Sequence, residues 1–468
     1  MVDFIRSREL QRSIHDVIPG GCHTYAKGDD QYPYLAPGFI SHGQGSHVWD
    51  VDGNEFIEYG MGCRAVTLGH AYQPVVEAAQ RELQRGLNFV RPAPIELECA
   101  EELLGMIDGA DMCKFAKDGS SVTTAALKLA RAHTGRDLVA FCVDHPFFAT
   151  NDWFIGSTAM DAGIPQAHKE LNLTFRYNDL ESVQRMFEQH PGRIAGLIME
   201  PAKYEDPQDH FLHKVQELCH AHGAVFILDE MITGFRWHNG GAQKYYDIVP
   251  DLSAFGKALA NGFSVSALVG KRQIMELGGL LHDKPRVFLL STTHGAETHS
   301  LAAAIATMRV YQTEPVIETL DRQGTRLAHG INLAIESNQL VGHVGIHGKP
   351  CCMVFSTCDQ EQRPSQAFRA LLMQELIRRG VVGPSLIVSY SHTDDDIDQT
   401  INAFQDALAV YRCALVEGVE RHLVGGPTKS VYRPYNDFTL NRLPSGVDNV
   451  APAVPTNVNY PAPAGSIQ

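Results

Sequence analysis

The chain has 468 residues and a mass of 51.5 kDa, and its 39 basic and 54 acidic side chains give a net charge of −15. A hydrophobic content of 44% with 20% charged residues is typical of a soluble globular protein and excludes wholesale disorder, and the length predicts roughly two to four domains. Because nucleic acids and anionic membranes bind clustered positive charge, the acidic balance argues against both as the main partner, although it is compatible with a local basic pocket for an anion.

Residues 1–75 are rich in Gly, Pro and aromatic residues, which is typical of turns and short strands. The segment 46–59 contains Asp52-Gly53, a pair that favours tight hairpin turns, so a β-hairpin is predicted there. No stretch at the amino terminus or elsewhere has the apolar length of a signal peptide or a membrane span.

Between residues 113 and 255, short apolar runs alternate with amphipathic helical patterns. Helices are predicted from about Val122 to His133, before Gly135, and from Phe211 to His222. The strand, helix, strand order implies parallel strands joined by right-handed crossovers, and therefore a layered α/β domain. The predicted strands are Cys113–Ala116, Leu138–Val143, Ile194–Met199, Ala224–Leu228 and Leu252–Phe255.

A second α+β unit is predicted after this domain, ending in a helix from Asp394 to about Glu417. The last 25 residues contain five prolines, which is too many for a packed core, so an extended tail is expected. The predicted organisation is an amino-terminal segment that packs on the small domain and the active site (1–75), a large domain (76–314), a small α+β domain (315–425) and the Pro-rich tail (426–468).

Polar residues follow four of the predicted strands: the turn 119–121, Glu200, Asp229 and Lys257. In open parallel sheets, ligands bind at the carboxyl ends of the strands. The turn opens a helix, and the free N–H groups of a helix start favour an anion such as phosphate. A plain helix cap is the alternative interpretation, and Asp118 beside the turn disfavours an anion.

Asp229 ends the apolar run AVFILDE, and Lys257 lies between two small residues. A buried aspartate can keep a ring nitrogen protonated, and a desolvated lysine with a lowered pKa is a Schiff-base nucleophile. The pair therefore suits pyridoxal phosphate (PLP) chemistry. The structural alternatives are that Asp229 is a solvated strand end and that Lys257 is an ordinary surface lysine.

Metal binding is not predicted. Four histidines between residues 210 and 222 fall mostly on the polar side of a predicted helix, without an HExxH motif, and the ten cysteines contain no CxxC pair. Free thiols in a reducing compartment, and hence a cytoplasmic protein, are expected.

Taken together, these motifs resemble the class III, fold-type-I PLP aminotransferases, and most of all their glutamate-1-semialdehyde aminomutase branch. The most specific match is ILDEMITGFRW (227–237), followed 28 residues after Asp229 by the lysine of GKALANGF. Supporting matches are GSHVWDVDGNEFIEY (45–59), TLGHAYQPV (67–75), MEPA (199–202), STTHGAETHSLAAA (291–304) and SHTDDDID (391–398). The resemblance implies a large three-layer αβα domain with a smaller α+β domain formed by the terminal segments.

The resemblance also implies roles for the matching residues. Lys257 would form a Schiff base with the cofactor PLP and then move a proton between the substrate Cα and the cofactor C4′. Asp229 would pair with the pyridine nitrogen. Gly119, Ser120 and Ser121 would hold the phosphate at the helix start.

Three further positions take their roles from the resemblance. Thr293 would reach the phosphate from the neighbouring subunit, which implies a homodimer with shared active sites. Phe147 falls where the family places an aromatic ring against the cofactor, and Glu200 falls in the Glu-Pro motif that lines the pocket.

The substrate would be bound by the loop PGGCHTYAKG and by Arg64. Lys27 stands near the position where the aminomutases have a substrate-binding arginine, with Thr24 and Tyr25 before it. Arg64 or Lys27 is a candidate for binding a substrate carboxylate, and arginine has the better bidentate geometry. A structural arginine paired with an acid is the alternative.

The predicted function is a PLP-dependent transaminase that moves an amino group from a donor to an oxo acid, aldehyde or keto-sugar acceptor through a pyridoxamine phosphate intermediate. Two alternatives are open: an intramolecular 2,1-aminomutase of the glutamate-1-semialdehyde type, and a non-catalytic regulatory or assembly subunit with the same fold.

Overall fold

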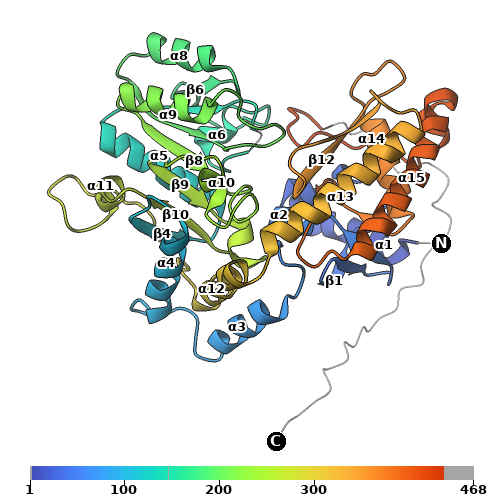
Figure 1. The fold of residues 1–468 in the computed structure, drawn as a ribbon, viewed down its shortest axis with the longest axis horizontal. Coiled ribbons are helices and arrows are strands. Elements are labelled where there is room, and N and C mark those ends of the chain that lie inside the picture. The colour runs from blue at the N-terminus through green and yellow to red at the C-terminus, as the bar shows by residue number, and fades with distance from the viewer. Residues whose placement is uncertain (1–2, 146, 437–468) are drawn as a thin grey trace, which may run out of the picture. The chain divides into compact units, whose positions relative to one another are not determined.

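Seven runs of the sequence form one mixed sheet in the computed structural model, which describes residues 3–145 and 147–436 (Figure 1). The strand order is β4-β10-β9-β8-β7-β5-β6, and β10 is antiparallel to both of its neighbours while the remaining pairs are parallel. The central strands are buried on both faces, which is why they read as continuous apolar runs. The strands are β4 (Met112–Ala116), β5 (Leu138–Cys142), β6 (Asn172–Phe175), β7 (Ile194–Met199), β8 (Val225–Asp229), β9 (Leu252–Phe255) and β10 (Ser266–Gly270).

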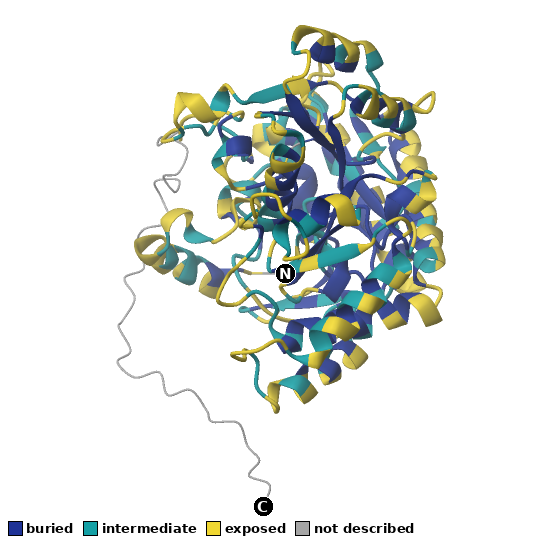
Figure 2. Cartoon of the chain, turned by 90° about the vertical axis from the view of Figure 1, so that its left-hand side faces the viewer, coloured by how far each residue is buried: buried dark blue, intermediate teal, exposed yellow. Residues whose placement is uncertain are grey.

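Helices cover the two faces of this sheet. Val139 and Ile227 share a core cluster with residues of α5, whereas Ala140 and Phe226 share another with residues of α8 and α9. Because neighbouring residues of a strand point to opposite faces, the sheet is the middle of three layers. Figure 2 shows buried strands inside helices whose outer faces are exposed. The helices here are α5 (Gly119–Thr134), α6 (Asp152–Ile155), α7 (Gln166–Lys169), α8 (Leu180–Gln189), α9 (Phe211–Ala221), α10 (Gly241–Tyr245) and α11 (Arg272–Met275).

The predicted α/β fold is confirmed, with small shifts of element ends. Helix α5 begins at Gly119, three residues before the predicted start, because the Asp118 carboxylate accepts the Ser121 N–H at 2.8 Å and caps the helix. Gly135 ends the helix in a left-handed conformation (φ 67°), as the sequence predicts. Asp229 is the last residue of β8 rather than the residue after it.

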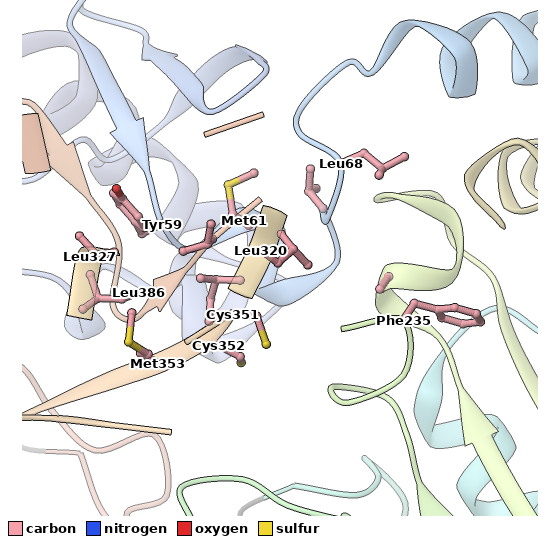
Figure 3. Packing of buried hydrophobic residues seen from close by; sticks show 14 of the residues in the cluster. Tyr59, Met61, Leu68, Phe235, Leu320, Leu327, Cys351, Cys352, Met353 and Leu386 are labelled. Carbon is pink, nitrogen blue, oxygen red and sulfur yellow. The ribbon is translucent and has the colours of Figure 1, made fainter. Parts of the chain in front are cut away.

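Helix α12 is buried along almost its whole length, which its run of alanines permits. It packs against α3, α4 and the turn that begins at Lys257. A further apolar cluster joins α13 to the amino-terminal segment and to β12 and β14; Figure 3 shows Met61, Leu320, Cys352 and Leu386 within it. These helices are α3 (Gln73–Leu83), α4 (Pro94–Met106), α12 (Thr298–Thr313) and α13 (Val316–Ser337).

Two small sheets complete the described chain. The predicted hairpin forms as β2 and β3 around Gly53, and β3 also pairs in parallel with β13, which joins the amino-terminal segment to the carboxyl-terminal region. The helix predicted from Asp394 to Glu417 is α15, whose first turn is capped by Thr393. The Pro-rich tail from residue 437 onward lies outside the described residues. The remaining elements are α1 (Ile5–Val17), β1 (Ile40–Gln44), β2 (His47–Asp50), β3 (Glu55–Glu58), α2 (Met61–Arg64), β11 (Val344–His347), β12 (Cys352–Thr357), α14 (Gln366–Ile377), β13 (Val381–Val382), β14 (Leu386–Ile387) and α15 (Asp394–Glu417).

All ten cysteines are free thiols, as the sequence predicts. Across residues 3–145 and 147–436, no helix combines the length and the apolar character that a membrane crossing requires.

Candidate functional site

Three ionisable side chains meet at the carboxyl edge of the parallel strands. Asp229 ends β8, Glu200 directly follows β7, and Lys257 opens the 3-10 turn Lys257–Ala260 after β9. Because β7, β8 and β9 are neighbours in the sheet, their ends lie side by side. Asp229 and Glu200 are 3% and 2% exposed, and both carboxylates act electrostatically on Lys257.

Burial shifts the pKa values of this group strongly. Desolvation raises the pKa of Asp229 to about 7, and the Glu200 carboxylate adds to the rise. Desolvation lowers the pKa of Lys257 to about 8, although the two carboxylates oppose the fall. A substantial fraction of Lys257 is therefore a neutral amine near neutral pH, which is the form that attacks a carbonyl.

Glu200 belongs to a buried polar network. Lys203 Nζ donates to Glu200 Oε1 at 2.7 Å, and the Glu200 backbone N–H donates to His145 Nδ1 at 3.0 Å. Burial acts to raise the pKa of Glu200, but Lys203 and His145 outweigh burial and the pKa is lowered. The carboxylate is thus ionised, and its Oε2 is buried without a hydrogen-bond partner in the structure. That oxygen is free to accept a hydrogen bond from a ligand.

His145 and Lys203 are site residues that sequence reasoning missed. Burial lowers the pKa of His145 to about 4, so the ring is neutral, and since Nδ1 accepts a hydrogen bond the proton is on Nε2. His145 follows the end of β5 as Glu200 follows the end of β7. The preference of ligand sites for the carboxyl ends of parallel strands, which indicated Glu200, also applies to His145. No comparable sequence pattern points to Lys203.

The start of α5 lies against the same edge. Ser121 gives both its N–H and its hydroxyl to Asp118, at 2.8 and 2.9 Å, while Ser120 Oγ accepts the Thr150 N–H at 3.0 Å. The amides of Gly119 and Ser120 belong to the first turn, where helices lack internal acceptors.

Two glycines are required by close packing around one methionine. A Cβ at Gly119 would lie 3.0 Å from Met231 Sδ, and one at Gly256 would lie 2.6 Å from the same sulfur. The space beside the lysine motif at Gly256 is therefore occupied by Met231, which connects the start of α5 to the end of β9.

Other predicted site residues lie on the surface of the single chain. Phe147 is 45% exposed and meets Phe154 edge-on, with ring centroids 5.7 Å apart. Thr293 is exposed, and its carbonyl accepts the Asn88 side-chain amide at 3.0 Å. Thr24, Tyr25 and Lys27 are exposed at a 3-10 turn. Within the described part of a single chain, this loop is therefore not buried in the site.

Arg64, in contrast, is partly buried and lies within electrostatic reach of Glu200. Burial acts to lower the pKa of its guanidinium, but the Cys352 sulfur, the Tyr204 hydroxyl and the Glu200 carboxylate raise it. Of the four predicted substrate contacts, Arg64 is the one that the structure places close to the buried acids.

A family model for the class III aminotransferases matches residues 25–408. This chain belongs to the class III aminotransferases. A glutamate-1-semialdehyde 2,1-aminomutase of Desulfitobacterium hafniense (strain Y51) is 31% identical over 427 residues, covering 86% of this chain and 98% of the relative. A 3-aminobutyryl-CoA aminotransferase of Cloacimonas acidaminovorans (strain Evry) is 29% identical over 414 residues, with 86% and 97% covered.

Solved structures share the fold. The PLP internal aldimine form of FumI from Sphingopyxis sp. MTA144 superimposes with a TM-score of 0.81 and 27% identity, covering 88% of this chain and 98% of FumI. The predicted fold-type-I architecture and the cofactor PLP are thus confirmed for this class III aminotransferase family member. The residues fit the cofactor, since the edge holds a lysine with a lowered pKa, a buried aspartate and an unpartnered carboxylate oxygen.

Proposed function

We propose that this chain is an aminotransferase, which transfers an amino group from a donor to a separate carbonyl acceptor. The observation that carries the proposal is the arrangement at the sheet edge of the partly buried Lys257 beside the buried carboxylates of Asp229 and Glu200. Lys257 would attach to PLP, Asp229 would hold the ring nitrogen, and the start of α5 (Gly119, Ser120 and Ser121) would hold the phosphate. Phe147 would face the ring once the site is assembled.

Bound PLP withdraws electrons from the substrate Cα, and the chain supplies the other parts of the reaction. Asp229 keeps the ring nitrogen protonated, because a buried carboxylate is stabilised by a positive partner. The Lys257 amine would move a proton between the substrate Cα and the cofactor C4′. Glu200 Oε2 accepts a hydrogen bond from the bound molecules, held in place by Lys203 and His145.

The substrate would be bound by Arg64 and, from the amino-terminal loop, by Thr24, Tyr25 and Lys27. That loop and Thr293 are exposed on one chain, which supports a homodimer in which Thr293 completes the phosphate site of the neighbouring subunit. Asn88 contacts Thr293, and the next two residues, Phe89 and Val90, are 52% and 100% exposed. Exposed apolar side chains of this kind are typical of subunit interfaces. The free thiols suit a reducing, cytoplasmic compartment.

The test of the chemistry is Lys257→Ala. Purified wild-type protein should show the visible absorbance of lysine-bound PLP, and the variant should lose both that absorbance and all detectable turnover. Phe115→Leu, on the neighbouring antiparallel pair, serves as a control for general disturbance of the sheet. A variant that keeps its colour and its turnover would contradict the assignment of Lys257.

Aminomutase activity is the second candidate, favoured by the aminomutase relatives. The two activities separate in one assay: an aminotransferase converts a donor only until its PLP is used, unless an oxo acid or aldehyde acceptor is added. Sustained conversion of a single amino-aldehyde without an acceptor would indicate the aminomutase. A colourless protein that binds no PLP would indicate a non-catalytic subunit.

A further inference from the structure

A buried arginine, Arg236, and a partly buried one, Arg64, lie beside the site without an ion-paired acid. Arg236 is 1% exposed, and the Nε atoms of both Arg236 and Arg64 are buried without a hydrogen-bond partner. Among the residues that the structure describes, no carboxylate forms an ion pair with either guanidinium. A buried cation without a counter-ion is strongly unfavourable, so an arrangement of this kind calls for an anion from outside the chain.

Arg236 fixes the backbone that carries Arg64. Its guanidinium donates to the Ile232 carbonyl at 2.7 Å, to Thr67 Oγ1 at 3.1 Å and to the Arg64 carbonyl. Arg64 belongs to an unusual turn in which four successive residues, Met61 to Arg64, have φ values of 40, 58, 58 and 70°. Residues with side chains rarely adopt this left-handed conformation, so the turn depends on contacts such as those of Arg236.

The chain just after the turn Met61–Arg64 is hydrogen-bonded to the segment that follows Lys257. The Leu68 N–H donates to Asn261 Oδ1 at 2.8 Å, and Asn261 Nδ2 donates to the Gly69 carbonyl at 2.9 Å. Asn261 lies four residues after Lys257 and is 8% exposed. The turn that carries Arg64 is therefore held in a defined position relative to the Lys257 amine.

More basic than acidic side chains lie around this turn. Lys203, Lys257, Arg64 and Arg236 act on one another or on the two buried acids, Glu200 and Asp229. Cys352 and Tyr204, which lie near Arg64, offer it a sulfur and a hydroxyl rather than a carboxylate. The start of α5, where the cofactor phosphate would bind, is built from other segments, around Met231 and Thr150.

We propose that the turn Met61–Arg64 forms a carboxylate subsite: Arg64 binds the carboxylate of the amino donor or oxo acid, and Arg236 is the positioning residue that holds Arg64. This rests on the proposed aminotransferase function and deepens it, because it names the substrates as carboxylate-bearing. It also names Arg64, rather than the exposed Lys27, as the residue that selects these substrates.

The test compares 4-aminobutyrate with butylamine, which has the same chain length but no carboxylate, in the half-reaction that converts PLP to pyridoxamine phosphate without an acceptor. Arg64→Gln should raise the apparent dissociation constant of 4-aminobutyrate at least about tenfold, as expected for loss of a charged hydrogen-bonded pair, and change that of butylamine less than about twofold. Arg236→Met should act in the same direction, and Arg236→Lys should restore part of the affinity. Arg185→Gln, an exposed residue of α8, is the matched control.

A second readout does not depend on turnover. Propionate, which carries a carboxylate but no amine, is titrated calorimetrically into the holoenzyme, and circular dichroism confirms that each variant is folded. Propionate binding to wild-type protein that is lost in Arg64→Gln supports the subsite whether or not either amine is converted. The proposed function fails separately, if Lys257→Ala keeps the absorbance and turnover of the wild-type protein. Conversion of 4-aminobutyrate with unchanged affinity in Arg64→Gln overturns the subsite while the function stands.

Discussion

Burial moves the pKa values of Lys257 and Asp229 in opposite directions because it disfavours the charged form of each group. The lysine becomes easier to deprotonate and the aspartate easier to protonate. In the proposed PLP site, the first shift would supply the attacking amine. The second shift would be reversed by a protonated ring nitrogen, which would pair with the Asp229 carboxylate and favour its charged form.

This pair predicts the pH dependence of cofactor capture. In the proposed assignment the neutral form of Lys257 attacks PLP. Because its pKa is lowered to about 8, the rate of PLP capture by the cofactor-free protein should rise with pH through about 8. Because the Asp229 carboxylate raises the lysine pKa, Asp229→Asn should move the midpoint to lower pH. Stopped-flow absorbance across a pH series gives both midpoints. A wild-type midpoint near 10.5, the ordinary lysine pKa, would contradict the buried-amine interpretation.

At the scale of elements, the start of α5 depends on one capping side chain. Asp118 accepts the Ser121 N–H and hydroxyl, although its charge disfavours a phosphate at the same helix start. We expect Asp118→Ala to lower the free energy of unfolding of the cofactor-free protein by about 1 kcal/mol, and Asp118→Asn to lower it by less, since Asn also caps helices. Urea denaturation measures both. Equal losses in the two variants would assign the effect to the charge rather than to the cap.

The left-handed turn at α2 is the second element whose conformation matters. Its three residues with side chains, Met61, Cys63 and Arg64, each cost roughly 1–2 kcal/mol in this conformation. Such strain persists where surrounding contacts determine the backbone, and it is found most often at functional sites. The bond from Arg236 to the Arg64 carbonyl supplies such a contact, and Asn261 holds the chain just after the turn at Leu68 and Gly69.

At the scale of the whole molecule, the proposed dimer predicts complementation between two damaged subunits. Lys257→Ala removes the reactive amine, and Thr293→Ala should weaken PLP binding by removing a phosphate contact. If Thr293 acts across the interface, a mixed dimer of the two variants contains one site with both native residues, and that site should bind PLP with wild-type affinity. Differently tagged subunits allow the mixed dimer to be purified and titrated with PLP. Affinity no better than that of Thr293→Ala alone would place Thr293 in its own subunit's site.

Local sequence patterns predicted five of the seven strands of the main sheet, three helices and the strand-end positions of Glu200, Asp229 and Lys257, but neither β6 nor the antiparallel β10. These depend on local patterns, because an apolar run followed by a polar residue predicts a strand and its end whatever the distant chain does. The spacing between ILDEMITGFRW and GKALANGF also indicated the family, which the family comparison confirms.

Which other groups share the site depends on the tertiary structure. His145 and Glu200 are 55 residues apart, and Arg236 and Arg64 are 172 residues apart, so no local pattern relates them. Burial likewise depends on how the whole chain packs. Lys257 would have an ordinary pKa in water, and desolvation at the sheet edge lowers that pKa. The conformation of the turn at Arg64 follows for the same reason, since the long-range bond from Arg236 holds it against the preference of its own residues.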